Sequence, residues 1–118
     1  LGSTIALCIL ETLVHLQDNS ALAAFTLFEL EVPDEQIMEL DSAVLPADWA
    51  ADPAPAALQA IGDAWLASHD CALLLVPSAI TGESNAILNP ANPAAAAIIA
   101  TAKARTFPLD PRLAKAQS

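Results

Sequence analysis

The sequence predicts a single α+β domain over residues 1–118, with packed helices on a mixed sheet. Three observations predict this class. Hydrophobic residues make up 55% of the chain, which is enough to build a core without disulfides or metal. Helical and strand-like hydrophobic patterns are mixed along the chain without a repeat. The predicted strands follow one another too closely for a run of crossover units, and the glycines form no phosphate-binding loop, so Rossmann and P-loop folds are excluded.

The first helix and the first strand are predicted near the N-terminal end. Apolar residues recur with helical spacing over residues 3–17, where Ser3 or Thr4 is the expected N-cap. Residues 24–32 follow an alternating pattern, which predicts a strand that ends at Pro33. We therefore expect a largely buried helix followed by a half-buried strand.

A turn and a long loop are predicted next. Residues 34–40 indicate a short helical turn with Asp34 as its cap. The proline-rich segment 45–55 predicts an ordered surface loop, which Trp49 holds against the body of the domain.

A second helix is predicted over residues 56–68. Gly62 lies inside it, and we expect this glycine to allow the close approach of a neighbouring element. The expected buried face consists of Leu58, Ile61, Trp65 and Leu66.

The segment 71–90 carries the most specific local pattern. Apolar runs at residues 72–76 and 86–88 predict two core strands, and the polar connection between them includes a glycine. A polar connection at the ends of core strands is a natural place for a ligand. Its polar residues are Ser78, Thr81, Glu83, Ser84 and Asn85.

A third helix and a last strand complete the predicted order. The helix covers residues 93–102, with Pro93 at its first position, and the strand covers residues 106–109. Cys8 and Cys71 lie in apolar runs without the close spacing of a metal site, so we expect two buried, reduced thiols.

Charge is divided unevenly along the chain. Thirteen of the 14 acidic residues lie in residues 1–102, whereas all four Lys and Arg residues lie in residues 103–118. The acidic segment 1–102 repels phosphate backbones, which argues against direct nucleic-acid binding. It is compatible either with a partner that has a basic face or with solubility alone. No apolar run reaches the length of a membrane span and no signal peptide is recognised, so we expect a cytoplasmic protein without membrane contact.

Few residues are candidates for chemistry. Glu11 and His15 lie one helical turn apart in an apolar helix, and burying an unpaired carboxylate there would cost several kcal/mol. Glu11 therefore pairs with His15, faces solvent, or faces a cleft. Ser78 has no nucleophile-elbow motif around it, and a turn hydroxyl bonded to its own backbone is the alternative. Glu83 and Asn85 are either solvated turn residues or part of the same site.

Several short blocks, in this order, resemble the RES-domain family and span nearly the whole chain. They are E-T-L-V-H (11–15), L-P-x-x-W (45–49), I-G-D-x-W-L (61–66), L-x-V-P-S-A (74–79), E-x-N-x-x-x-N-P (83–90) and F-x-L-D-x-R-L (107–113). The resemblance rests on the combined order of the blocks.

The resemblance implies an ADP-ribosyltransferase-like fold and the toxin of a bacterial toxin–antitoxin pair with an Xre-like antitoxin. Such a toxin consumes NAD by cleaving the nicotinamide–ribose bond, through hydrolysis, phosphorolysis or ADP-ribosyl transfer to a protein target. Glu11 and Ser78 match the family's glutamate and serine as catalytic residues. Ser78 and Asn85 would orient the substrate, and His15 and Glu83 are weaker candidates. NAD is expected as substrate and no metal is expected.

The sequence departs from the family pattern in two places. The family's arginine belongs to a segment before the first helix that these residues do not contain, so we expect a domain that lacks its N-terminal segment. Ala91 follows Asn89-Pro90, where relatives often carry a histidine. These departures leave an alternative open, which is a non-catalytic acidic interaction module that binds a basic protein partner.

Overall fold

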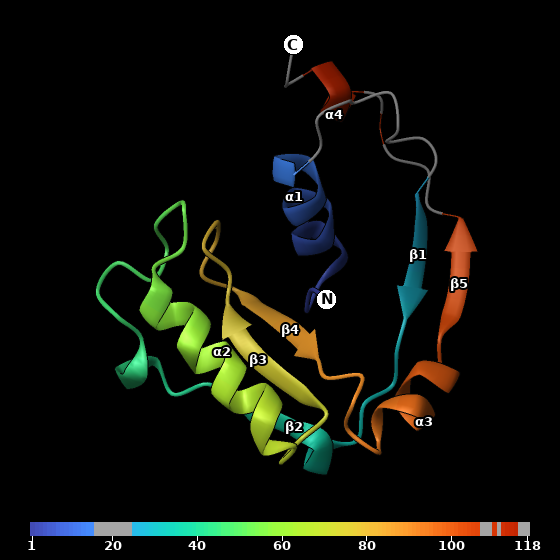
Figure 1. Ribbon diagram of the computed structural model, residues 1–118. Coiled ribbons are helices and arrows are strands. Elements are labelled where there is room, and N and C mark those ends of the chain that lie inside the picture. Colours follow the sequence, from blue (N-terminus) through green and yellow to red (C-terminus); the bar gives the residue numbers. More distant parts are fainter. Residues whose placement is uncertain (16–24, 107–109, 111, 116–118) are drawn as a thin grey trace.

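The computed structural model describes residues 1–15, 25–106, 110 and 112–115 (Figure 1). Helices and two small sheets are mixed along the chain, so the predicted α+β class is confirmed. The helices are α1 (Ile5–His15), α2 (Ala56–Ser68), α3 (Ala95–Ala100) and α4 (Arg112–Lys115). The strands are β1 (Thr26–Glu29), β2 (Ile37–Glu39), β3 (Leu73–Pro77), β4 (Ser84–Leu88) and β5 (Lys103–Thr106). Short 3-10 turns cover Asp34–Gln36 and Ser42–Val44.

The larger sheet has the strand order β2-β3-β4. Strands β3 and β4 form an antiparallel hairpin in which Val76 lies opposite Asn85. Strand β2 runs parallel to β3, and α2 connects these two strands across one face of the sheet (Figure 1). The described residues thus contain one crossover unit rather than a run of them. Residues 1–3 extend the sheet beside β4, where Gly2 forms an isolated antiparallel bridge with Asn85.

Strands β1 and β5 form a separate antiparallel ribbon, and α1 lies between this ribbon and the larger sheet in the view of Figure 1. Its residues are mostly exposed, and Thr26 lies opposite Thr106. An ion pair between Arg105 Nη2 and Glu29 Oε1, 3.4 Å apart, links the two strands on the surface.

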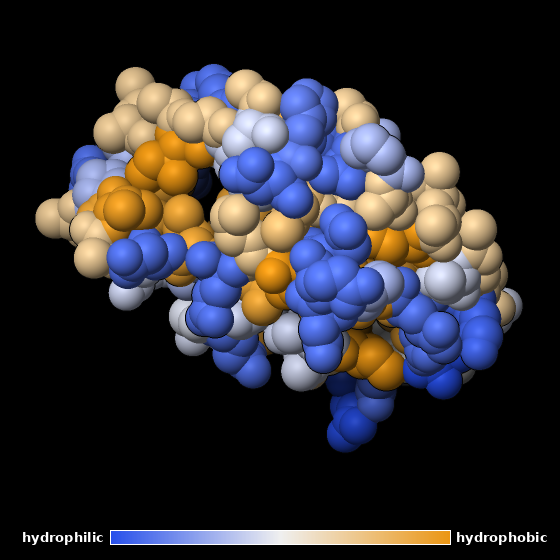
Figure 2. All heavy atoms as spheres, turned by 90° about the horizontal axis from the view of Figure 1, so that it is seen from below, coloured by the Kyte–Doolittle hydropathy of each residue, from blue (hydrophilic) through white to orange (hydrophobic). Residues whose placement is uncertain are grey.

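Most of the buried apolar residues lie in or directly before β3 and in α3, with one each from α1 and α2. They are Leu7, Trp65, Ala72, Leu73, Leu74, Ala95 and Ile98. On the face seen in Figure 2, apolar surface lies in separate patches between hydrophilic residues. Among the described helices, none has both the length and the apolar character required to cross a membrane.

Helix α2 has the predicted bounds, but two of its residues differ from expectation. Trp65 is buried, whereas Leu66 is 40% exposed and does not belong to the core. A Cβ atom added to Gly62 would meet no atom within 4 Å, so the expected close approach at this glycine is wrong. Gly62 faces open space instead.

The structure also corrects the prediction for residues 34–40. The helical turn ends at Gln36, Asp34 is its first residue rather than its cap, and Ile37–Glu39 forms strand β2. Three residues are too few for a visible alternation. Their extended conformation comes from pairing with β3, which lies far away in sequence.

Other element boundaries shift by a few residues. Helix α1 begins at Ile5 because the Oγ1 atom of Thr4 accepts a hydrogen bond of 3.1 Å from the Leu7 N–H, so Thr4 is the cap. Strand β1 is shorter than predicted because the Glu31 N–H donates to Thr101 Oγ1 instead of to a neighbouring strand. Residues 16, 17 and 24 of the predicted elements lie outside the described residues.

Near the C-terminal end, α3 begins at Ala95 rather than Pro93, because Asn92 Oδ1 accepts the Ala94 N–H in a preceding turn. The last strand of the described residues, β5 (Lys103–Thr106), begins three residues before the predicted start, and the predicted residues 107–109 lie outside the described part. Both cysteines are free, as predicted, but each is half-buried rather than buried.

Candidate functional site

Three elements bring polar side chains together around the Glu11 carboxylate of α1. The Ser78 hydroxyl, at the end of β3, donates a hydrogen bond of 2.6 Å to Glu11 Oε1. The Asn85 side-chain amide, on β4, donates a second bond of 2.7 Å to the same oxygen. Two residues of the polar connection therefore meet a helix residue that lies 67 and 74 positions away in sequence.

The turn after β3 holds the Ser78 hydroxyl in place. Ser78 is 1% exposed, and its Oγ atom also accepts the N–H groups of Ile80 at 3.1 Å and Thr81 at 3.4 Å. Its own backbone N–H and C=O bond to Glu83 O and Gly82 N at 2.7 and 2.9 Å. This hydroxyl is thus a turn hydroxyl, one of the two interpretations of Ser78 left open by the sequence, and it also donates to the carboxylate.

Asn85 is positioned by the sheet on both sides. It lies opposite Val76 on β3, and Gly2 pairs with it on the other edge of β4. Gly2 is also packed tightly against α1, since a Cβ atom there would lie 2.7 Å from Cys8 Sγ. The small residue at position 2 lets α1 approach the edge of β4, which is how Glu11 reaches Asn85.

The hydrogen bonds lower the pKa of Glu11 below its ordinary value of 4.5. The Ser78 hydroxyl is the largest cause and the Asn85 amide the second, because each donates to the charged form. Partial burial opposes them, and the nearby charge of His15 adds a smaller lowering effect. Glu11 is therefore ionised at neutral pH.

Glu11 and Asn85 line an open cleft of about 420 Å³ between the start of the chain, α1 and the edge of the β3–β4 hairpin. The lining residues are Leu1, Gly2, Cys8, Glu11, Thr12, Val76, Asn85, Ala86 and Ile87. Ser78 is not among them, because its hydroxyl contacts the carboxylate instead of the cleft. A fixed carboxylate beside a largely apolar wall can stabilise positive charge that develops on a bound molecule.

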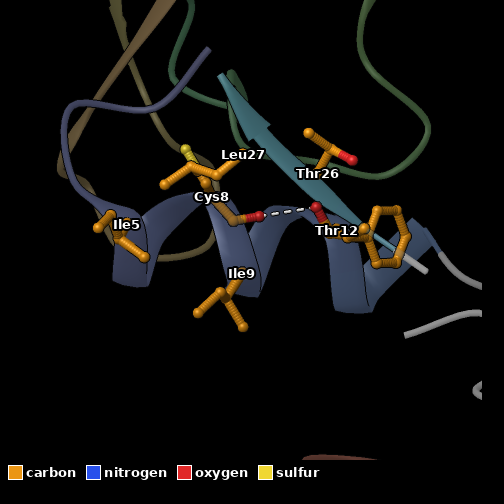
Figure 3. A pocket seen from close by; sticks show the side chains of 7 residues that line it. Ile5, Cys8, Ile9, Thr12, Thr26 and Leu27 are labelled. Carbon is orange, nitrogen blue, oxygen red and sulfur yellow. Dashed lines mark hydrogen bonds between the residues drawn. The ribbon is translucent and has the colours of Figure 1, made fainter. Parts of the chain in front are cut away.

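Cys8 and Thr12 join the cleft although they were not sequence candidates. Both also line a smaller hollow between α1 and β1. There the Thr12 hydroxyl donates a hydrogen bond of 2.8 Å to the Cys8 carbonyl (Figure 3). Cys8 precedes Glu11 by three residues, so helical spacing alone could have placed it on the same face. Thr12 follows Glu11 directly and gives no comparable signal.

The two weaker candidates lie outside the hydrogen-bonded cluster. His15 is the last residue of α1 and is exposed, and the hydrogen bonds that the described residues make to the Glu11 carboxylate come from Ser78 and Asn85. Glu83 has an exposed side chain and takes part in the turn through its backbone. Within the described residues, no group of three or more His, Cys, Asp or Glu side chains could hold a metal ion.

Comparisons with known proteins agree on one family. The model of the RES domain matches residues 1–110 of this chain. A protein named Toxin Res from Yersinia enterocolitica serotype O:8 / biotype 1B is 42% identical over 114 residues, covering 96% of this chain and 75% of that protein. A Toxin Res from Photorhabdus laumondii is 38% identical, covering 98% of this chain and 75% of that protein. A protein named Prs ADP-ribosylating toxin from Sphingobium sp. is 41% identical, covering 95% and 71%.

Proposed function

The chain belongs to the RES domain family, and from this premise we propose that it is a toxin that consumes NAD by breaking the nicotinamide–ribose bond. The observation that carries the proposal is the Glu11 carboxylate, which two donors hold at the wall of an open cleft. In the reaction, the bond between the ribose C1′ and the nicotinamide nitrogen breaks, and its electron pair leaves with neutral nicotinamide. The ribose carbon passes through an oxocarbenium-like state, which a fixed anion stabilises.

The hydrogen-bond pattern supports a division of roles within the carboxylate. Both donors bind Oε1, so we assign Oε2 to the ribose side of the ligand. Ser78 and Asn85 then act together to hold the carboxylate ionised and oriented. Preorganised groups of this kind need no rearrangement at the moment of reaction, which is where their catalytic effect arises.

The electron pair that completes the bond to C1′ can come from water, phosphate or a protein side chain. The similarity to a protein named as an ADP-ribosylating toxin favours transfer to a protein.

The test is to incubate the purified full-length protein with NAD labelled in its ADP-ribose part and with bacterial extract. Transfer leaves label on a protein band, whereas hydrolysis or phosphorolysis leaves all the label on small-molecule products. If the labelled NAD remains intact, with neither labelled protein nor labelled cleavage products, the proposal is contradicted.

The toxin proposal includes an Xre-like antitoxin partner in the bacterial cytoplasm. Thirteen acidic residues and no Lys or Arg occur in residues 1–102, which suits a partner with a basic binding face. Co-expression of tagged toxin with the antitoxin encoded beside it would test this. A complex that forms equally well at low and high salt would argue against an electrostatic contribution.

A second candidate function is supported by the charge of the cleft. Its lining residues include no Lys or Arg that could hold a pyrophosphate. This observation favours a non-catalytic acidic module that binds a basic protein. If the full-length protein neither binds nor cleaves labelled NAD but still captures the antitoxin, this second candidate replaces the first.

A further inference from the structure

We propose that an apolar hollow under helix α2 is a binding site for one small, uncharged aromatic ring. The hollow has a volume of about 150 Å³ and lies between α2, the β3–β4 hairpin and the loop that carries Trp49. It differs from the Glu11 cleft in position and chemistry, and the inference goes beyond the proposed function. Its lining residues are Leu40, Leu45, Trp49, Leu58, Ile61, Gly62, Leu74, Val76, Pro77 and Ile87.

The lining excludes charged ligands. None of these residues is ionisable, and the only side-chain polar atom among them is the indole nitrogen of Trp49. Transfer of a charged or strongly polar group into such surroundings is unfavourable unless a partner satisfies it. An uncharged apolar group loses nothing comparable, and it removes apolar surface from water.

Gly62 is the second observation that points to an occupant. Glycine in the middle of a helix is less favourable than alanine by about 1 kcal/mol, so it is usually kept where a neighbour must come close. No such neighbour exists here, because a Cβ atom at position 62 would meet nothing within 4 Å. Gly62 instead lines the hollow, so we expect a large side chain at this position to reduce the free volume of the hollow. The glycine thus leaves this part of the wall without a side chain.

The volume determines the size of the occupant. An enclosed apolar cavity of about 150 Å³ is large enough to bind one benzene molecule. The hollow has this volume and is partly open to solvent, and Trp49 provides an aromatic surface at its wall. A single six-membered ring therefore fits, whereas a nucleotide or a peptide side chain with a charge does not.

The hollow shares two wall residues with the Glu11 cleft, namely Val76 and Ile87. A ring bound under α2 would therefore contact side chains that also border the cleft. Val76 lies opposite Asn85, one of the two donors to Glu11. Occupancy of the hollow should be detectable on both sides of the hairpin.

The test uses benzene as the probe and the full-length protein with labelled Leu, Ile and Val methyl groups. Benzene should shift the NMR signals of Leu58, Ile61 and Leu74, with a Kd of about 1 mM because so small a ring makes few contacts. Gly62→Leu fills the hollow and should weaken this binding at least tenfold. Ala64→Leu adds the same side chain to an exposed position of α2 and should leave binding unchanged.

Two results would overturn the proposal. One is the absence of saturable shifts at these methyl groups in the wild-type protein. The other is equal binding in the wild-type protein and in Gly62→Leu. If Gly62→Leu does not fold, Gly62→Met provides a flexible side chain for the same comparison, and the location of the shifts in the wild-type protein tests the site independently. Neither readout depends on NAD cleavage, so failure here is distinguishable from failure of the proposed function.

Discussion

At the scale of single residues, the Glu11 carboxylate depends on donors that lie more than 60 positions away in sequence. The Ser78 hydroxyl is the largest cause of the lowered Glu11 pKa. The same hydroxyl accepts two backbone N–H groups of its own turn. Ser78 thus couples the conformation of the turn to the orientation of the carboxylate.

Ser78→Ala is expected to reduce NAD turnover by about 10²-fold, because the carboxylate loses its closest donor and its fixed position. The variant should also lose about 1 to 3 kcal/mol of stability, because two backbone N–H groups lose their acceptor. The pH–rate profile separates the two effects, since the apparent pKa of the acidic limb should rise only if Ser78 acts on Glu11. Thr81→Ala removes an exposed hydroxyl of the same turn and should leave that apparent pKa unchanged. An unshifted profile in Ser78→Ala would contradict the positioning role.

The lowered pKa of Glu11 also predicts how stability depends on pH. Its folded-state pKa lies below the ordinary value of 4.5, so the contribution to stability is fully present above that value. The contribution is lost as the pH falls through the lowered folded-state pKa. Urea unfolding of the wild type and Glu11→Gln, compared from about pH 6 to about pH 3, isolates this group from the other acids. The difference in unfolding free energy should shrink toward acid pH, and a constant difference would rule out the stabilising hydrogen bonds.

Sequence patterns and family resemblance located these residues but not their contacts. Glu11 stood out as a carboxylate in an apolar helix, and its candidate partner from helical spacing was His15. The actual partners come from β3 and β4, because Gly2 is small enough to let α1 pack against the sheet edge. Spacing within one helix contains no information about such a contact between elements.

At the scale of elements, the turn from Ser78 to Glu83 and the helix α2 each contain a glycine with a testable role. Gly82 has a φ angle of 76°, in the left-handed region, and its N–H donates to the Ser78 carbonyl. Glycine adopts this conformation without steric cost, unlike residues with a side chain.

Gly82→Ala should destabilise the protein by about 1 kcal/mol, because alanine is strained at this φ angle. NAD turnover should fall as well, since the turn holds the Ser78 hydroxyl. Gly82→Asn is the matched control, because asparagine tolerates the left-handed region better than alanine. Thermal unfolding of the three proteins measures their stability, which should decrease in the order wild type, Gly82→Asn, Gly82→Ala. If alanine proves as stable as glycine, the turn does not have this conformation.

Gly62→Ala should have the opposite effect and raise stability by about 0.5 to 1 kcal/mol. Alanine is the better helix former, and its methyl group would enter open space. The melting temperature measures this directly. A decrease would mean that a neighbouring group occupies the space beside α2.

Periodic elements were predicted better than elements defined by long-range pairing. Helix α2 was predicted with its observed bounds because its thirteen residues display a helical apolar pattern. In the structure the helix ends at His69, whose backbone is left-handed. Strand β2 was missed because three residues show no period, and their strand conformation depends on parallel pairing with β3. The last strand was placed too late because its position is set by pairing with β1.

At the scale of the whole molecule, the α+β class followed from composition and pattern, but the arrangement of the sheets did not. The ribbon pairs Thr26 with Thr106. In the larger sheet, residues 1–3 lie beside β4, which ends at Leu88. These contacts are non-local, and a single sequence contains no direct signal for them. The consequence for function is that the candidate site forms only when α1, the turn after β3, and β4 have assembled.

The most direct test of the account is the rate of nicotinamide release from NAD by the full-length wild-type protein, Glu11→Gln and Glu83→Gln. Both substitutions remove one carboxylate, but Glu83 is an exposed residue of the turn whose side chain lies outside the cleft lining. We predict that Glu11→Gln lowers the rate by at least about 10²-fold, in the range found when a key electrostatic group is lost, while Glu83→Gln keeps it. Equal rates in the wild type and Glu11→Gln would contradict the assignment of Glu11 as the catalytic carboxylate.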